Sequence, residues 1–400
     1  MAALLSRAMA IVSLLGLLHC DSSPPVEPPV TGPTPACSPT PIVPGPPPVH
    51  DPSALPRTVE FRKVLERDVS EVTGFPSGVA VTPDGRWLIS LGFSRRTVTV
   101  HDAGTLEPVT GPLEVIDSIR LSQPHAVVVS PDGSMAVLTN RSGVVGICLP
   151  SLEPLFHLST AILNSPRHVV PDPTGESYYI SSQLDGIARL SATGEVKAFF
   201  EDAFVTAAMS LTRDGQELLV VTDNGRRLVV LSALDLNPRL SVDLEVSVEV
   251  PFKGEVVVPL RDQHAIIVGG DPVGGETAVQ EPIMALSVDL STGVVGSPQV
   301  LFEVEGSTAP LLLGDGNEWV DVGESTAIVP TQAGTVTIDT NLGTVAFHSA
   351  AELDENVPPC CDIARYPDGN RVVFSALADV HTGGSLIIYD VEESNDPSLR

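Results

Sequence analysis

Lysine and aromatic residues are scarce in this chain of 400 residues. Its only lysines are Lys63, Lys197 and Lys253, and aromatic residues make up 4% of it. With 50 acidic against 22 basic side chains the formal net charge is −28, which repels phosphate backbones and anionic lipid surfaces. With so few aromatic rings, stacking platforms that hold bases or sugars are not expected. Nucleic acid is therefore not an expected partner.

The familiar signatures of enzymes and cofactor sites are also missing. The sequence contains no G-x-S-x-G elbow, no P-loop and no G-x-G-x-x-G after a strand. It lacks the C-x-x-C-H motif that attaches haem, and the spacings H-x-x-x-H and C-x-x-C that often bind metals. No cofactor and no metal site is predicted, although a divalent metal held by residues far apart in sequence stays an open option.

The chain does have a repeated sequence pattern, in which an apolar run, a tight turn and a second apolar run follow one another. Residues 79–82 lead into Asp84-Gly85, and the pattern occurs again at residues 127–138. Glycine adopts positive φ without steric cost, which suits such turns. Seven units are predicted, with turns at Asp84-Gly85, Asp132-Gly133, Thr174-Gly175, Asp214-Gly215, Asp262-Gln263, Gly323-Glu324 and Asp368-Gly369.

The strand pattern predicts an all-β fold. Several strands are continuous apolar runs, which indicates burial on both faces, and no helical periodicity is sustained. Seven four-stranded antiparallel units at spacings of about 40–50 residues predict a seven-bladed β-propeller. Residues 58–61 are expected to complete the last sheet and latch the ring. A β-helix or a pair of sandwiches is the alternative.

The motif Pro-x-x-(apolar)-x-x-Pro-Asp-Gly, followed by a strand ending in Asp, resembles the YVTN or lactonase-like propeller repeat. The resemblance covers roughly residues 70–391 and is strongest in the first, second and last units. It implies a seven-bladed propeller and leaves a lactonase-type activity open.

The N-terminus, residues 1–20, has the pattern of an export signal. Arg7 precedes an apolar stretch at residues 8–18, which is too short to span a bilayer comfortably. The boundary at Cys20 resembles the lipobox of bacterial lipoproteins, which implies acylation of that thiol. The expected location is the cell envelope, in the periplasm or at the outer membrane, with contact to the membrane only through a lipid anchor. Secretion after cleavage is the alternative.

Residues 21–57 are predicted to be a disordered spacer, and residues 58–400 the propeller. The spacer holds fourteen prolines between Asp21 and Pro56, a composition that favours extended polyproline segments and cannot form a packed core.

Candidate site residues come from the loops at the mouth of the central channel. The loops that lead into the first strands carry His125, His168, Glu255 and Asp362, which could act as acid and base or bind a metal. The alternative is that they satisfy backbone groups at a narrow mouth. Arg141 and Arg167 could orient a carboxylate ligand or neutralise neighbouring aspartates. The full set of predicted ligand-binding residues is Asn140, Arg141, Arg167, Gln183, Asp185, Asp223, Asn224, Gln332 and His381.

The cysteines give one further hypothesis. Cys360 and Cys361 are adjacent, and in an oxidising compartment they could form a strained vicinal disulfide. Cys37 and Cys148 have no evident partner, and Cys148 is expected to be a small buried hydrophobe.

These observations favour a monomeric, envelope-tethered propeller that acts as a binding or scaffold module for a protein or small ligand. The alternative is a lactonase-like or metal-assisted hydrolase that uses the histidines and carboxylates at the mouth. A degenerate relative without any ligand is a third reading. No partner or substrate can be named from the residues.

Overall fold

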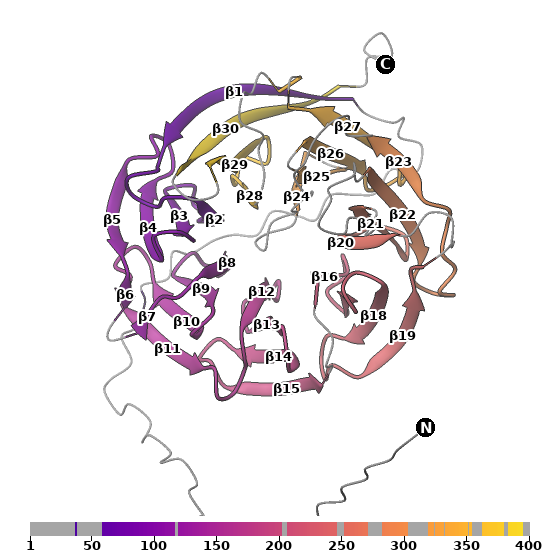
Figure 1. The fold of residues 1–400 in the computed structure, drawn as a ribbon, viewed down its shortest axis with the longest axis horizontal. Helices are drawn as coiled ribbons and strands as arrows, with labels where there is room; N and C mark the ends of the chain where they lie inside the picture. The colour runs from indigo at the N-terminus through magenta and orange to yellow at the C-terminus, as the bar shows by residue number, and fades with distance from the viewer. Residues whose placement is uncertain are drawn as a thin grey trace, which may run out of the picture. The chain divides into compact units, whose positions relative to one another are not determined.

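The computed structural model is a ring of seven four-stranded antiparallel sheets around a central axis (Figure 1). It describes residue 37 and residues 58–116, 119–201, 206–245, 252–270, 282–302, 319–323, 325–331, 333–350, 352–353, 362–379 and 383–394. The predicted all-β, seven-bladed propeller is confirmed. No helix within these described ranges has the length and the hydrophobicity needed to cross a bilayer.

The first four blades follow one another along the chain, each with its strands in sequence order from the axis outward. Blade 1 consists of β2 (Pro76–Val81), β3 (Trp87–Gly92), β4 (Thr97–Asp102) and β5 (Pro108–Leu113). Blade 2 consists of β8 (Pro124–Val129), β9 (Met135–Asn140), β10 (Gly143–Cys148) and β11 (Pro154–Ser159). Blade 3 consists of β12 (Pro166–Pro171), β13 (Ser177–Ser182), β14 (Gly186–Ser191) and β15 (Val196–Glu201). Blade 4 consists of β16 (Ala208–Leu211), β17 (Glu217–Thr222), β18 (Arg227–Ser232) and β19 (Pro238–Asp243).

The remaining three blades complete the circle, and the last one takes its outer strand from the start of the described propeller. Blade 5 consists of β20 (Lys253–Pro259), β21 (His264–Gly270), β22 (Ile283–Asp289) and β23 (Gln299–Phe302). Blade 6 consists of β24 (Val320–Val322), β25 (Thr326–Thr331), β26 (Gly334–Asp339) and β27 (Val345–Ser349). Blade 7 consists of β28 (Asp362–Arg365), β29 (Arg371–Asp379), β30 (Gly383–Ser394) and β1 (Thr58–Asp68). A short hairpin of β6 (Val115–Ile116) and β7 (Ile119–Arg120) lies between blades 1 and 2 in the chain.

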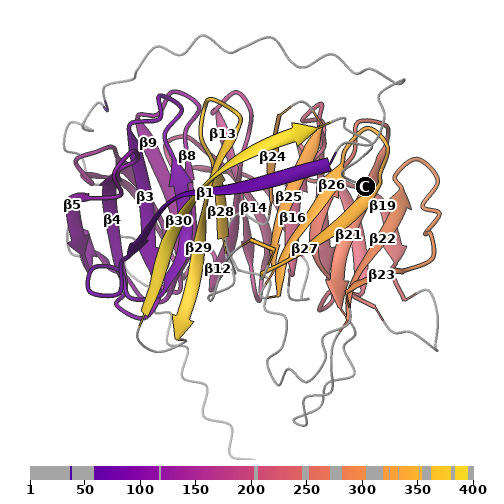
Figure 2. The same cartoon turned by 90° about the horizontal axis from the view of Figure 1, so that it is seen from above.

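The ring is closed by β1, which runs beside β30 at the rim (Figures 1 and 2). Its first paired residue is Thr58, opposite Ser394, and its last is Asp68, opposite Ser385. The predicted latch is thus confirmed, but the strand is longer than the expected residues 58–61. The rest of the strand was not predicted because charged side chains at residues 60, 62, 63 and 66–68 interrupt any apolar pattern, and an edge strand needs no such pattern on its outer face.

The seven turns between first and second strands gather at one end of the blades, called here the turn face. At four of the junctions between blades a turn proline packs against the turn glycine of the next blade. A Cβ at Gly133, where φ is +72°, would lie 3.3 Å from Cδ of Pro83, and one at Gly175 would lie 2.8 Å from Cδ of Pro131. Glycine is therefore needed both for the left-handed turn and for the close approach. The turn aspartates hold these turns, as Asp132 does by accepting from the amide of Ser134 at 3.1 Å.

The hydrophobic core is divided into seven clusters, one in each gap between consecutive blades. The gap between blades 7 and 1 holds Val79 and Leu88 from one side and Val373 and Leu386 from the other, all fully buried. Both faces of each inner strand are therefore packed, which explains the continuous apolar runs. The circle is closed by apolar packing as well as by β1.

One cysteine expectation is wrong. Cys148, at the end of β10, is bonded to Cys37 in a disulfide with a Cα–Cα distance of 5.4 Å. It is buried, with 5% of its surface exposed, but it is not a free thiol. The pairing could not be read from the sequence because the two residues are 111 positions apart. Cys20, Cys360 and Cys361 lie outside the described residues.

Buried histidines make the stability of the propeller depend on pH. His101 on β4 is fully buried, with Nε2 2.8 Å from Oγ of Ser90 and Nδ1 3.0 Å from the carbonyl of Leu106. Burial lowers the pKa of His101 to about 4, and it lowers that of His348 as well. The unfolded chain, whose histidines have a pKa near 6.5, therefore binds protons before the folded one does.

We predict that the free energy of unfolding is highest above pH 6.5 and falls as the pH drops from 6.5 to 4, by up to about 3 kcal/mol for His101. The measurement is denaturant unfolding at several pH values on the whole chain and on His101→Gln. The variant should be less stable at pH 7 and should show a shallower pH slope. Equal slopes for the two proteins would contradict the assignment.

Candidate functional site at the channel mouth

The end of the ring opposite the turn face is called here the mouth face. It carries the loops that lead into each first strand and the loops between second and third strands. In blade 2 these are the residues before Pro124 and the turn between Asn140 and Gly143. A backbone bond ties the two loops together, because the amide of Arg141 donates to the carbonyl of Ser122 at 2.7 Å.

A bulge recurs where the first strands of four blades start at the mouth face. The pairing between first and second strand shifts there, and the intervals are Pro76/Gly78, Pro124/Val127, Pro166/Val169 and Gly254/Val256. A β-bulge leaves a residue outside the ladder and re-aims its side chain. The predicted site residues His125, Arg167, His168 and Glu255 all lie in these bulges.

Hydroxyl side chains from the second strands satisfy the amides that the bulges remove from the ladder. Oγ1 of Thr139 accepts from the amide of Ala126 at 3.1 Å, and Oγ of Ser181 accepts from the amide of His168 at 3.0 Å. Thr139 also donates to the carbonyl of Arg167, in the next blade. These hydroxyls were not predicted as part of the site, although each stands in the second strand opposite a bulge.

The two mouth histidines are buried, with 5% of His125 and 3% of His168 exposed. The ring of His125 lies 6.0 Å from that of Phe93, between their centroids. Among the residues that the structure describes, no three His, Cys, Asp or Glu side chains are placed to hold a metal ion together. The proposed set of His125, His168, Glu255 and Asp362 is therefore not assembled as a metal centre within those residues.

Asp362 joins the last blade to the first. It is fully buried, and its Oδ2 accepts from the amide of Val79 at 2.5 Å while Oδ1 accepts from the amide of Ile363 at 2.8 Å. Val79 belongs to blade 1 and Asp362 to blade 7. The carboxylate thus supports ring closure at the axis, where β1 does so at the rim.

Arginine side chains at the mouth are oriented by neutral amides. Arg141 is exposed, and its Nη1 donates to Oε1 of Gln123 at 3.2 Å. Arg167 is half-buried, and with the Gln183 amide oxygen turned toward it, Nη2 and Nε donate to that oxygen at 2.9 and 2.5 Å. The Gln183 amide nitrogen then donates to Oγ of Ser165 at 3.1 Å. These bonds orient the two guanidinium groups.

The residues that precede Pro124 and Pro166 have the same strained backbone. Gln123 has φ of 49° and Ser165 has φ of 52°, in the left-handed region that side chains other than glycine rarely adopt. Each contributes a side chain to the set that holds an arginine. Neither was predicted, although a polar residue before a proline at the same place in two blades was the available signal.

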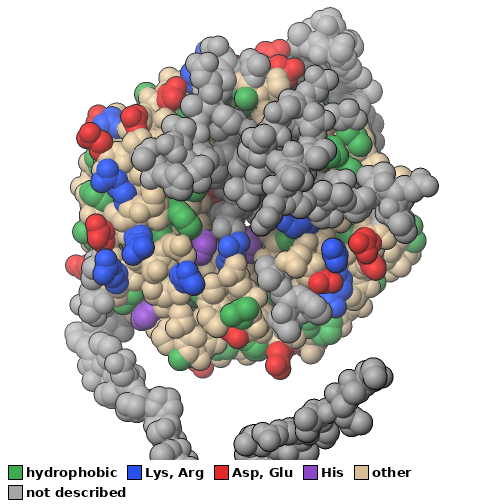
Figure 3. Space-filling model, in the orientation of Figure 1, with side chains coloured by type: hydrophobic (Ala, Val, Ile, Leu, Met, Phe, Trp, Pro, Cys, Tyr) green, Lys and Arg blue, Asp and Glu red, His purple; other side chains and the backbone are tan. Residues whose placement is uncertain are grey.

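Basic side chains lie near the centre of the described part of the mouth face, with histidine beside them (Figure 3). The described cations of the mouth loops and bulges are Arg95, Arg96, Arg141, Arg167, Arg226, Arg227 and Lys253. The same loops also carry acids, of which Glu255 accepts from Nζ of Lys253 at 3.0 Å. The cations nonetheless stand out in a chain of net charge −28.

Other predicted ligand residues use their polar groups within a mouth loop or between two mouth loops of the same blade. Asn140 is fully buried, accepting from the amide of Ser142 at 2.8 Å and donating to the carbonyl of Gly143 at 3.1 Å. Asp185 accepts from the amide of Asn164 at 2.5 Å. Asp223 and Asn224 form the β17–β18 turn with φ of 54° and 53°. Gln332 and His381 lie outside the described residues.

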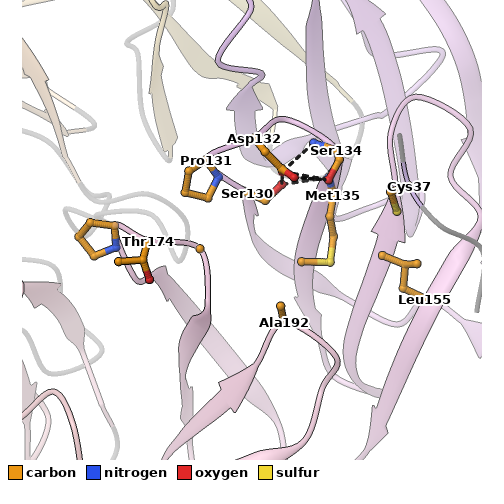
Figure 4. A pocket seen from close by; sticks show the side chains of 11 residues that line it. Cys37, Ser130, Pro131, Asp132, Ser134, Met135, Leu155, Thr174 and Ala192 are labelled. Carbon is orange, nitrogen blue, oxygen red and sulfur yellow. Dashed lines mark hydrogen bonds between the residues drawn. The ribbon is translucent and has the colours of Figure 1, made fainter. Parts of the chain in front are cut away.

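The turn face has a cavity of about 740 Å³ between blades 2 and 3 (Figure 4). Its wall includes Cys37, Met135 and Leu155, and the carboxylate of Asp132 is already bonded to Ser130 and Ser134. Since that carboxylate is engaged and none of the predicted site residues lines this cavity, we do not assign the functional site to it.

The fold defines the chain as a seven-bladed β-propeller. No protein-family model and no curated protein sequence matches it. Among solved structures it is similar to a chain of hydrazine synthase from Kuenenia stuttgartiensis, at 16% identity and a TM-score of 0.58, over 76% of this chain and 93% of that one. At that identity the likeness shows the shared fold alone.

We predict that Asp362→Ala lowers the free energy of unfolding by about 1.5–3 kcal/mol, because two buried amides lose a carboxylate acceptor. Denaturant unfolding of the purified protein measures this. Asp368→Ala, in the exposed turn of the same blade, is the matched control and should cost less than half as much. An unchanged midpoint for Asp362→Ala would show that the bond does not hold blades 7 and 1 together.

Proposed function

We propose that this protein is an exported binding module whose mouth face holds a ligand, or a surface group of a partner protein, that bears a carboxylate. The observation that carries the proposal is the pair Arg141 and Arg167, each oriented by a glutamine at the channel mouth. Guanidinium groups bind carboxylates through two parallel N–H···O bonds. Fixing their orientation in advance reduces the entropy that binding costs.

The charge of the rest of the chain supports this reading. An acidic protein repels anions in general, so a locally basic mouth selects anions that can reach it in the right geometry. Neighbouring blades present Arg141 and Arg167, so a ligand with more than one carboxylate could engage both. Half-burial of Arg167 strengthens the interaction relative to one in open water.

The test is calorimetric titration of the whole protein with citrate and with poly-glutamate at low salt. We expect saturable binding that weakens at least tenfold, or about 1.4 kcal/mol, in Arg167→Ala. Arg239→Ala, which removes an exposed cation from the turn face, is the matched control and should bind as the unchanged protein does. Failure of both probes to bind, or equal affinity in Arg167→Ala, would contradict the proposal.

A lactonase-like or metal-assisted hydrolase is the second candidate, and it is favoured by the two histidines in adjacent bulges next to Arg167. It predicts turnover of a lactone panel that is lost in both His125→Ala and His168→Ala. Citrate binding without any turnover would favour the binding module instead.

Export is supported by the Cys37–Cys148 bond, because disulfides persist in oxidising compartments. The apolar stretch at residues 8–18 and the lipobox-like Cys20 support a lipid anchor in the bacterial envelope. The YVTN-like repeat agrees with such a location by resemblance only.

We predict that, in a bacterial host, the protein fractionates with membranes and that Cys20→Ser moves it to the soluble exported fraction. The intact mass of the mature chain should correspond to an acylated Cys20 at its N-terminus. A mature chain that starts elsewhere, or an unmodified protein that is already soluble, would contradict the anchor without affecting the ligand test.

A further inference from the structure

The Cys37–Cys148 disulfide joins the chain ahead of the propeller to the turn face of blade 2. Cys148 is the last residue of β10 and pairs with Met135, the first residue after the turn at Asp132-Gly133. Cys37 lies at the cavity beside this turn (Figure 4). The attachment point is therefore on the face opposite the mouth.

The order of attachments along the chain matters. Force applied to the N-terminus is transmitted along the chain to Cys37 before it reaches β1, which begins at Thr58. β1 closes the ring, yet within it only Val59 is a buried side chain among those described. β1 is also held by its hydrogen-bonded ladder with β30 and by exposed ion pairs such as Arg62 with Asp390. Exposed ion pairs of this kind contribute little to stability.

Without the disulfide, a pull on the two ends of the chain would act directly on the latch. Thr58 and Ser394 are paired neighbours at one end of the β1–β30 ladder. Force applied to these two residues separates an antiparallel ladder pair by pair, starting at that end. Each step then breaks only one or two hydrogen bonds, so the latch is weak in this geometry.

With the disulfide, the same pull enters β10. Every residue of β10 is buried, and the strand is hydrogen-bonded to β9 on one side and β11 on the other. Load at Cys148 must therefore disrupt an inner strand of a packed blade rather than an edge strand. The covalent bond itself is far stronger than any of these contacts.

We propose that the Cys37–Cys148 disulfide is the attachment through which the N-terminal segment transmits mechanical force, so that tension on the N-terminus enters blade 2 and spares the ring-closing strand β1. It also places this attachment, through Cys148, on the turn face of blade 2. The inference does not depend on which ligand the mouth binds or on whether Cys20 carries a lipid.

The test is single-molecule pulling of the whole purified protein between its two termini, before and after treatment with dithiothreitol. In the oxidised protein the first rupture should need a high force, and the loop of 111 residues should stay hidden. Reduction should lower the first-rupture force and add about 400 Å to the total released length, at ~3.6 Å per residue. Cys37→Ser without reductant should behave as the reduced protein does.

The double variant Cys360→Ser/Cys361→Ser is the matched control, because it loses two thiols but keeps this disulfide, and it should respond to reduction as the unchanged protein does. The proposal is overturned if oxidised and reduced proteins share the same first-rupture force, even where equilibrium stability differs. That outcome would mean that the disulfide stabilises the protein only by reducing the conformational entropy of the unfolded chain. An unchanged released length would instead show that Cys37 and Cys148 are not bonded.

Discussion

The pairing of β1 with β30 is the contact on which the rest of the propeller depends. It joins the start of the described propeller to its last strand, and so turns a row of seven sheets into a closed ring. Closure gives blades 1 and 7 their shared apolar layer, which an open row would expose to water. The bond from Val79 to Asp362 repeats the closure at the axis.

Ring closure also determines what the mouth can do. Convergence of the first strands brings bulges from neighbouring blades side by side, and hydroxyls such as Thr139 bond one blade to the next. The arginines lie in these bulges and in short turns next to the inner strands rather than on long loops. Preorganisation of this kind is what a binding site needs, and the same packing keeps His125 and His168 buried.

Much of the fold could be predicted from the sequence because each blade turn has a local signature. Asp-Gly and its variants mark where first strands end, and the number of blades follows from them. The full length of β1 was not predicted, since its outer face is charged. The Cys37–Cys148 bond was missed because Cys37 lies in a proline-rich segment without any periodicity. The roles of Asn140 and Asp362 could not be predicted either, because they depend on turn and inter-blade geometry that appears only after the blades pair.

In this structure β1 holds the ring closed. The most direct measurement compares thermal unfolding of two chains, one beginning at Thr58 and one beginning at Val69, which lacks only β1. The shorter chain should lose the cooperative transition of the longer one, or unfold at a much lower temperature. Coincident unfolding curves would show that the ring stands without its latch.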